Sequence, residues 1–311
     1  MTLWQLRTLL AVIETRSFSA AALELDSAQS AVSYAVAELE RDLGVRLLER
    51  GRFGARPTAV GERVAAHARA MTGLAEALRQ EAALEHGAVQ GRVRVATFRS
   101  MASQVLPKVM ARLRRSHPGL EVGVMEENGD APELERLLLS GYAEVAFLQA
   151  PYPEEALVWD LLKDPYVALL PQGHPLAGGL VRRADLFRLP LILYDDDDFC
   201  RRVVQQYLAE ADPSAGLAYR PSYSVREDST IFSLVEQGLG ISVVPELAFR
   251  DLPDTVLRVP LAEPLTRTLG VAVAPQSFKV PAVRVFLDAL RAQFPESGLP
   301  TFRTGSGATV S

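Results

Sequence analysis

The sequence predicts a mixed α/β protein in three parts: a winged helix-turn-helix, a long linker helix and a larger α/β domain with two lobes. Residues 1–58 carry short helical patterns separated by tight turns, and residues 59–88 carry one continuous apolar seam. Residues 91–296 alternate strand and helix patterns. A chain of 311 residues, 48% of them hydrophobic, is long enough to bury more than one core.

The first 58 residues predict three short helices. Leucines and an isoleucine at helical spacing between residues 3 and 13 give the first helix one apolar face. Ser17 begins the start signal of a second helix, and a third runs from about Ala28 to Asp42, where Gly44 stops it. The apolar face of the third helix consists of Ala31, Val32, Ala35, Val36 and Leu39. Two short helices joined by a turn form a helix-turn-helix pattern, and the Gly-rich basic stretch 50–57 suits a small β-wing.

Residues 59–88 predict one long helix, opened by Gly61 and Glu62 and closed by His86-Gly87. Its apolar residues alternate spacings of four and three, which is a heptad seam over about three repeats. The seam consists of Val64, Ala68, Met71, Ala75, Leu78 and Ala82. So narrow a seam on so long a helix indicates a linker that also dimerises. The alternative is an amphipathic helix packed on its own domain.

The α/β region predicts seven strands with helices between them. The strands are expected at 93–97, 120–124, 145–148, 166–170, 191–194, 241–244 and 269–273, and the helices at 103–116, 132–140, 200–210, 229–237 and 281–293. Repeated βαβ units predict parallel sheets with helices on both faces, divided between two subdomains. The last residues, 297–311, are rich in Gly, Ser and Thr and are expected to be a disordered tail.

Composition excludes several classes of protein. A single cysteine excludes an intrachain disulfide framework, and the four histidines are not spaced as metal ligands, so no metal or cofactor is predicted. There is no secretory signal pattern and no apolar run of about 18 residues, so we expect a cytoplasmic protein with no membrane partner. The net charge of −5 argues against nucleic-acid binding by the whole surface, but residues 46–56 form a local basic stretch.

Several segments together carry a family resemblance. LWQLRTLLAVIETRSFSAAALEL and AQSAVSYAVAELERDLGVRLLERG are typical of opening helices and of a recognition helix with its wing. TAVGE opens the long helix, and QGHPLAG and LVEQGLGISVVP lie in the α/β region. On these segments the chain resembles the LysR-type transcriptional regulators, over about 295 of its 311 residues.

The resemblance implies a winged helix-turn-helix over 1–58, a linker and dimerisation helix over 59–88, and a periplasmic-binding-protein-like effector domain over 91–296. Lobe I would comprise about 91–165 and 268–296, and lobe II about 166–267. The family is usually homotetrameric. The implied partners are double-stranded operator DNA, a small-molecule effector and a second copy of the chain, with RNA polymerase as a further candidate. Because the family usually has Ser or Thr where this chain has Ala28, we expect the cap of the recognition helix at Ser27 or Asp26.

A recognition helix reads bases with polar side chains near its N-terminal end. The candidates are Gln29, Ser30, Ser33 and Tyr34, with Arg50, Arg52 and Arg56 of the wing for phosphates or a narrow minor groove. Without the family pattern, these residues would equally suit an ordinary solvated face beside a polar loop. Residues 1–58 hold seven arginines and seven acids, so several wings would have to act together on DNA.

The cleft between two α/β lobes forms where strands end and helices begin. The resemblance places an effector pocket there, lined by Arg99, Ser100, Met101, Asn128, Gln149, Phe199, Cys200, Arg201, Ser229 and Thr230. For each residue taken singly, helix capping or core packing is the competing interpretation. Arg99 and two helix N-termini favour a small anionic ligand. The run Asp195–Asp198 is expected to be a solvated loop and helix cap, or else an acidic rim that selects ligands.

Cys200 leaves an alternative function open. The segment LILYDDDDFCRRVVQQYL resembles the peroxide-sensing OxyR branch of the family, and a helix N-terminus lowers a thiol pKa. Phe199 stands where that branch tends to have His, there is no second cysteine, and the aspartates disfavour a thiolate. We therefore expect a pocket-lining thiol. Two other classes compete: an enzyme, for which no convincing catalytic motif is present, and a small-molecule-binding protein without a DNA role, which leaves residues 1–88 unexplained.

Overall fold

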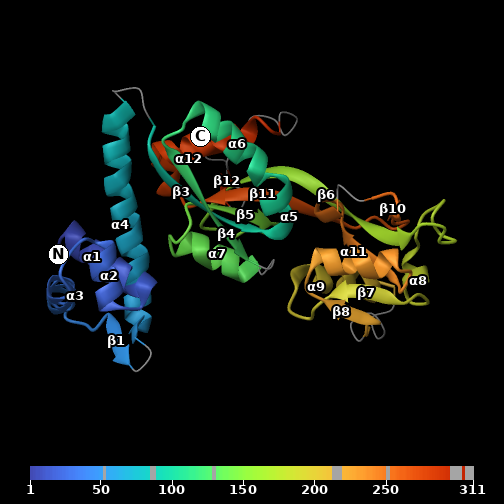
Figure 1. The fold of residues 1–311 in the computed structure, drawn as a ribbon, viewed down its shortest axis with the longest axis horizontal. Coiled ribbons are helices and arrows are strands. Elements are labelled where there is room, and N and C mark those ends of the chain that lie inside the picture. The colour runs from blue at the N-terminus through green and yellow to red at the C-terminus, as the bar shows by residue number, and fades with distance from the viewer. Residues whose placement is uncertain are drawn as a thin grey trace.

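The computed structural model describes residues 1–51, 54–84, 89–127, 131–211, 219–249, 253–294 and 303–304. Three bodies follow one another along its long axis: an N-terminal domain with the long helix α4, a central α/β lobe I, and an outer lobe II (Figure 1). A winged helix-turn-helix followed by a linker helix and two α/β lobes confirms the predicted fold class.

The N-terminal domain consists of three helices and a hairpin. They are α1 (Leu3–Thr15), α2 (Phe18–Glu24), α3 (Gln29–Leu43), β1 (Leu48–Gly51) and β2 (Gly54–Pro57). The Ser17 hydroxyl caps α2 as predicted by accepting a hydrogen bond from the Ala20 amide. The expected cap of α3 at Ser27 or Asp26 is wrong: the cap is Ala28, which offers no side-chain acceptor. Asp26 lies in the turn with φ 48°, too early in the chain to reach the first amides of α3.

The hairpin is fastened to the end of α1. The Ala55 amide donates to the carbonyl of Arg16, the left-handed residue that caps α1, at 2.9 Å. A Cβ on Gly54 would collide with that same carbonyl, so the hairpin can approach α1 this closely because residue 54 is glycine. The orientation of the wing therefore follows from the way α1 ends.

Helix α4 (Ala59–Leu84) begins at residue 59, as predicted, and the Thr58 hydroxyl caps it by accepting a hydrogen bond from the Gly61 amide at 2.9 Å. Its predicted end at His86-Gly87 lies outside the described residues. The predicted seam is buried to different extents along the helix. Ala68 is buried in the N-terminal core, whereas Met71 and Leu78 are 42% and 71% exposed.

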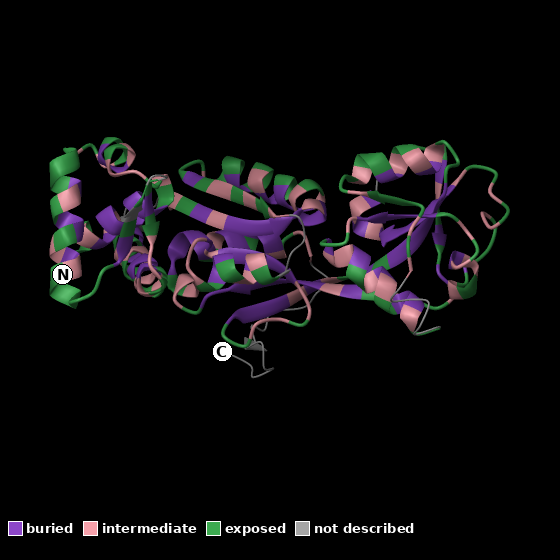
Figure 2. Cartoon of the chain, turned by 90° about the horizontal axis from the view of Figure 1, so that it is seen from below, coloured by how far each residue is buried: buried purple, intermediate pink, exposed green. Residues whose placement is uncertain are grey.

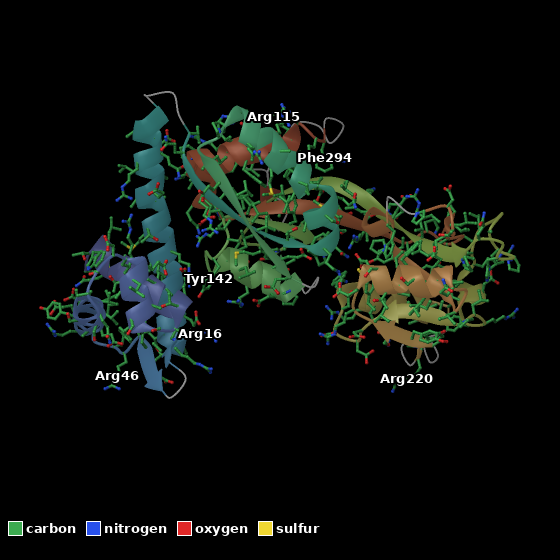
Figure 3. The ribbon with its side chains drawn as sticks, in the orientation of Figure 1. Arg16, Arg46, Arg115, Tyr142, Arg220 and Phe294 are labelled. Carbon is green, nitrogen blue, oxygen red and sulfur yellow. The ribbon has the colours of Figure 1, made fainter. Side chains whose placement is uncertain are left out.

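Helix α4 also packs on lobe I. The guanidinium of Arg69 lies 3.3 Å from the ring centre of Tyr142, the residue labelled between the two bodies in Figure 3, and donates to the Ser140 carbonyl at 3.2 Å. Near the other end of the helix, the buried Gln80 side chain accepts from the Ala282 amide at 3.1 Å. One helix therefore contacts both the N-terminal domain and lobe I.

Lobe I is a sheet with helices on both sides. Its elements are β3 (Gly91–Phe98), α5 (Arg99–Gln104), α6 (Leu106–Ser116), β4 (Leu120–Glu127), α7 (Ala131–Leu139), β5 (Val145–Gln149), β11 (Thr266–Val273), η2 (Ser277–Lys279) and α12 (Pro281–Arg291). The single helix predicted over 103–116 is two helices, because Pro107 cannot donate a hydrogen bond to α5 and instead opens α6.

Strand β6 (Leu157–Pro171) continues through both lobes and pairs with β11 up to Pro165, then with β9 (Ile241–Pro245) and β10 (Val256–Pro260) from Tyr166 onward. The strand order is β4-β3-β5-β11-β6-β9-β7-β8, where β7 is Leu191–Tyr194 and β8 is Tyr223–Val225, and β10 and β12 (Arg303–Thr304) also pair with β6. The expectation of wholly parallel sheets is wrong. Pairs β3–β4, β3–β5, β7–β8 and β7–β9 are parallel, but β11 runs antiparallel to β5 and β6, because the chain returns from lobe II in the opposite direction.

Lobe II has its own cores on the two faces of its sheet. Its elements are α8 (Arg183–Leu186), β7 (Leu191–Tyr194), α9 (Phe199–Ala209), β8 (Tyr223–Val225), α11 (Asp228–Glu236), β9 (Ile241–Pro245), η1 (Glu246–Phe249) and β10 (Val256–Pro260). The buried residues concentrate in the strands of each lobe, with exposed residues on the outer helix faces (Figure 2). Of the predicted tail 297–311, the described residues Arg303–Thr304 form β12, antiparallel to β6.

Substitution by alanine at two glycines of α4 should change the free energy of unfolding in opposite directions. A Cβ on buried Gly61 would collide with the carbonyl of Leu47, whereas a Cβ on Gly73 meets no atom within 4 Å. Gly61→Ala should lower the free energy of unfolding by about 1–3 kcal/mol. Gly73→Ala should raise it by up to about 1 kcal/mol through helix propensity. Urea unfolding followed by circular dichroism measures both, and equal effects of the two substitutions would contradict this packing of α4.

Candidate DNA interface and ligand cleft

Helix α3 has one buried and one exposed face. Val32, Val36 and Leu39 are buried against α1 and α2. Gln29, Ser30 and Tyr34 are exposed, and Tyr34 keeps 65% of its surface accessible. Ser33 is half-buried, and Ala31, which was placed on the apolar face, is exposed. The start of α3 therefore presents amide, hydroxyl and aromatic groups outward on a rigid helix, which is the arrangement that reads base edges in a major groove.

Several arginines lie at the hairpin end of the N-terminal domain, which also contains α3. Arg56 is exposed on β2; Arg50 lies in β1, its side chain outside the described part, and Arg52 lies outside the described residues. Arg16 and Arg46 are also exposed at this end of the domain (Figure 3). Neither was named as a candidate DNA contact, although Arg46 begins the basic stretch 46–56. The signal for Arg16 was its position directly after the first helix, where a cap is expected.

A small cavity of about 40 Å³, open to solvent, lies between the two lobes. It is lined by Phe98, Arg99, Ser100, Leu134, Leu148, Gln149, Tyr194, Asp198, Phe199, Cys200, Asp228, Pro245, Ala248 and Arg267. Apolar walls with a few converging polar groups are typical of small-molecule sites. In the part of the chain that is described, no group of three or more His, Cys, Asp or Glu residues suits a metal ion.

Five of the ten predicted pocket residues line this cavity: Arg99, Ser100, Gln149, Phe199 and Cys200. Met101 is not among the described lining residues, since it is buried in the core of lobe I. Arg201 turns into lobe II, where it donates to the Tyr194 carbonyl at 2.8 Å. Ser229 and Thr230 are exposed on α11, and Asp228 before them faces the cavity instead. Asn128 lies outside the described residues.

Nine of the fourteen lining residues were not predicted to line the pocket, and Arg267 is one of them. It is 6% exposed and pairs with Asp164, which is 2% exposed, through Nε at 2.8 Å and Nη2 at 2.7 Å. Nη2 also donates to Ser100 Oγ at 3.1 Å, and Nη1 lies 3.8 Å from Cys200 Sγ. The predicted strand began at residue 269, beyond this arginine. The residues Thr266-Arg267-Thr268 extend the strand ahead of residue 269, and this extension was the signal available in the sequence.

The two arginines of the cavity are both paired with carboxylates. Arg99 of lobe I contacts Asp198 at 3.1 Å and Asp228 at 3.7 Å, both on lobe II. With Asp164 on Arg267, three carboxylates face two guanidinium groups, an excess of one negative charge. The free positive charge from which an anionic ligand was predicted is therefore absent among the described residues of the cleft. The aspartate run does provide a helix cap, since Asp198 accepts from the Cys200 amide at 2.7 Å.

Cys200 lies on the cavity wall at the start of α9. Burial raises the pKa of its thiol to about 11, and Asp198 acts in the same direction, while Arg267 offsets part of the rise. Burial likewise raises the pKa of the neighbouring Asp198 carboxyl. The site therefore favours the neutral thiol, which is a poor nucleophile.

A DNA-reading helix with its wing, joined by a linker helix to a two-lobed ligand-binding domain, defines a ligand-responsive transcriptional regulator. Comparison with known protein families supports this class. Residues 3–62 match the bacterial regulatory helix-turn-helix protein of the lysR family, and residues 86–295 match the LysR substrate binding domain. The chain belongs to the LysR family of DNA-binding transcriptional regulators.

Relatives and solved structures resemble most of the chain. The "Probable HTH-type transcriptional regulator LrrA" of Synechococcus elongatus is 44% identical over 95% of this chain and 98% of its own. A "Probable hydrogen peroxide-inducible genes activator" of Mycobacterium avium is 31% identical over 79% of this chain and 78% of its own. A full-length OxyR variant from Pseudomonas aeruginosa has the same fold, with a TM-score of 0.74 at 24% identity over 94% of this chain and 95% of that one. None of the described helices is long and apolar enough to cross a membrane.

The raised thiol pKa predicts slow chemistry at Cys200. Because the pKa rises from 9.0 to about 11, the thiolate fraction at neutral pH is about 100-fold below that of an ordinary cysteine. Alkylation by iodoacetamide at pH 8 should be at least that much slower in the folded protein than in urea, and should accelerate as the pH approaches 11. The neutral thiol stabilises the fold below pH 9, and this contribution is lost as the pH rises toward 11. Mass spectrometry of quenched samples measures the rate; equal folded and unfolded rates would contradict the assignment.

Proposed function

We propose that this LysR-family regulator binds a pseudo-palindromic operator as a symmetric dimer joined through α4, and that a small molecule bound between the lobes modulates this binding. The observation that carries the proposal is the exposed polar N-terminal end of α3, held on a buried apolar face. Two symmetry-related copies of α3 would enter successive major grooves, one helical turn or a multiple of it apart. Such a regulator acts where its operator DNA is, in the cytoplasm.

The α4 surface supports dimerisation. Met71, Leu74 and Leu78 form an exposed apolar stripe on one side of the helix, and Trp4 of α1 is also 42% exposed. Apolar side chains at this spacing usually meet a second helix. Pairing two dimers through their effector domains gives the homotetramer that the family implies, and RNA polymerase is then a candidate partner of the DNA-bound form.

The cleft supports effector binding by its position between two lobes. We propose the division predicted from the sequence, with lobe II beginning near Tyr166, because β6 exchanges its pairing partners there. An anionic effector remains our prediction. It must compete with Asp198 and Asp228 for Arg99, so binding would exchange an internal ion pair for one with the ligand.

Peroxide sensing through Cys200 is the second candidate, favoured by the similarity to the peroxide-inducible activator of Mycobacterium avium. The raised pKa of this half-buried thiol argues against it, since peroxide oxidises the thiolate. Oxidised Cys200 at low peroxide, together with a peroxide-dependent change in DNA footprint that Cys200→Ser abolishes, would favour this second candidate over a metabolite effector.

Alanine substitution of a base-reading residue should affect DNA binding differently from alanine substitution of a phosphate-binding residue. Gln29→Ala and Ser33→Ala should each reduce discrimination between operator and random DNA by about 1–3 kcal/mol. Arg56→Ala should weaken binding to both DNAs alike and reduce the dependence on salt. Fluorescence anisotropy with labelled duplexes at several salt concentrations separates the two effects. Unchanged specificity in Gln29→Ala would show that α3 does not read bases in this way.

The apolar stripe of α4 makes a prediction about assembly. Leu78→Glu would place an unpaired charge in the helix–helix contact, so it should yield monomers or loosened oligomers that lose binding to a two-half-site operator. Leu78→Met keeps an apolar side chain of similar volume and serves as the control, with assembly retained. Multi-angle light scattering measures the mass, and an unchanged mass of the folded Leu78→Glu protein would refute dimerisation through this stripe.

A further inference from the structure

Arg99 crosses the cleft from lobe I and ends in a set of acceptors that all belong to lobe II. Its Nη2 donates to Asp198 Oδ2 at 3.1 Å, its Nε lies 3.7 Å from Asp228 Oδ1, and its Nη1 donates to the Arg226 carbonyl. The guanidinium carbon also lies 5.1 Å from the ring centre of Tyr194, within the range of a cation–π contact. Two carboxylates, a carbonyl and an aromatic ring thus surround one guanidinium group.

The acceptors on lobe II are held in place by contacts of their own. The other carboxylate oxygen of Asp198 accepts from the Cys200 amide at 2.7 Å as the cap of α9. The Tyr194 hydroxyl donates to Asp228 Oδ1 at 2.6 Å, which fixes this carboxylate at the first turn of α11. The positions of both carboxylates therefore follow from the fold of lobe II, whether or not Arg99 is present.

We propose that the lobe II wall of the cleft is a preorganised guanidinium-binding half-site and that Arg99 is its built-in ligand, which holds the cleft closed until an effector displaces it. The regulatory meaning of this clamp rests on the proposed function. The half-site itself does not, because it is defined by contacts within lobe II and by its occupant from lobe I.

Burial makes the clamp stronger than an ordinary surface ion pair. The side chains of Arg99 and Asp198 are 20% and 10% exposed, compared with 53% and 34% for the surface pair of Arg136 and Glu133. Solvent screens the surface pair and leaves it nearly neutral in energy, whereas the clamp is partly withdrawn from water. Since Arg99 is tethered to the opposite lobe, its effective concentration at the half-site far exceeds that of a weak free ligand.

Closure of the cleft would then require no effector, which alters what an effector must do. A ligand can shift the lobes only by binding the open and closed forms with different affinity. With Arg99 in place, the closed form is already the favoured one, and a ligand acts by taking either Arg99 or its carboxylate partners. The half-site also defines a measurable chemistry: with the side chain of residue 99 shortened, it should accept a small guanidinium ion from solution.

The test uses the full-length protein with Arg99→Ala and methylguanidinium as the probe, at matched ionic strength. Isothermal titration calorimetry should show saturable binding at least ten times tighter than to the wild type or to the control Arg136→Ala. Adding Asp228→Asn to Arg99→Ala should abolish this binding. None of these measurements involves DNA, so failure of the DNA-binding proposal leaves their outcome unaffected.

The lobe positions provide the second readout. Spin labels at Arg115→Cys on lobe I and Arg220→Cys on lobe II, the outward positions labelled in Figure 3, report the distance between the lobes. Arg99→Ala should lengthen or broaden the distance distribution, and methylguanidinium should restore it. Arg99→Lys, which keeps the charge without the planar fork, should give an intermediate distribution and replaces Arg99→Ala if that variant does not fold. Unchanged distances in a folded variant, or the absence of saturable probe binding, would overturn the proposal.

Discussion

The geometry of the cleft depends on the buried ion pair between Asp164 and Arg267. These residues face each other on β6 and β11, at the point where the chain passes between the lobes. Two charges at this depth are tolerable only as a pair, because each one alone would carry the full cost of leaving water. The register of the two strands is therefore tied to this contact. The same guanidinium reaches Ser100 of lobe I and Cys200 of lobe II, so one side chain connects the hinge with both walls of the cavity.

A second charged contact, Arg99 with Asp198 and Asp228, crosses the same cleft. The hinge pair joins two neighbouring strands, whereas the Arg99 contact joins side chains of the two lobes across the cleft. Under the proposed clamp, the Arg99 contact is the part of the site that changes when an effector binds, and the hinge pair belongs to the folded framework.

Helix α4 connects the cleft with the DNA face. Its first half packs in the N-terminal core, and its side chains Arg69 and Gln80 contact lobe I. Burial lowers the pKa of Arg69, which has no carboxylate partner among the described residues and is instead covered by Tyr142. A movement of lobe I against α4 would have to break these contacts. The helix that carries the apolar stripe is therefore also the helix on which lobe I is seated.

The sequence by itself determined the local elements and the family. The spacing of Val32, Val36 and Leu39 defined the recognition helix, and the lone Cys200 excluded a disulfide, because both depend on near neighbours or on composition. The tertiary structure decided which charged side chains form ion pairs. Arg99 and Asp198 are 99 positions apart, and Arg267 and Asp164 are 103 apart. No periodicity encodes such pairs, since they form through strand order and the approach of two lobes. The sequence predicted an unpaired positive charge at Arg99. In the folded chain Arg99 is paired, because folding brings Asp198 and Asp228 of the other lobe next to it.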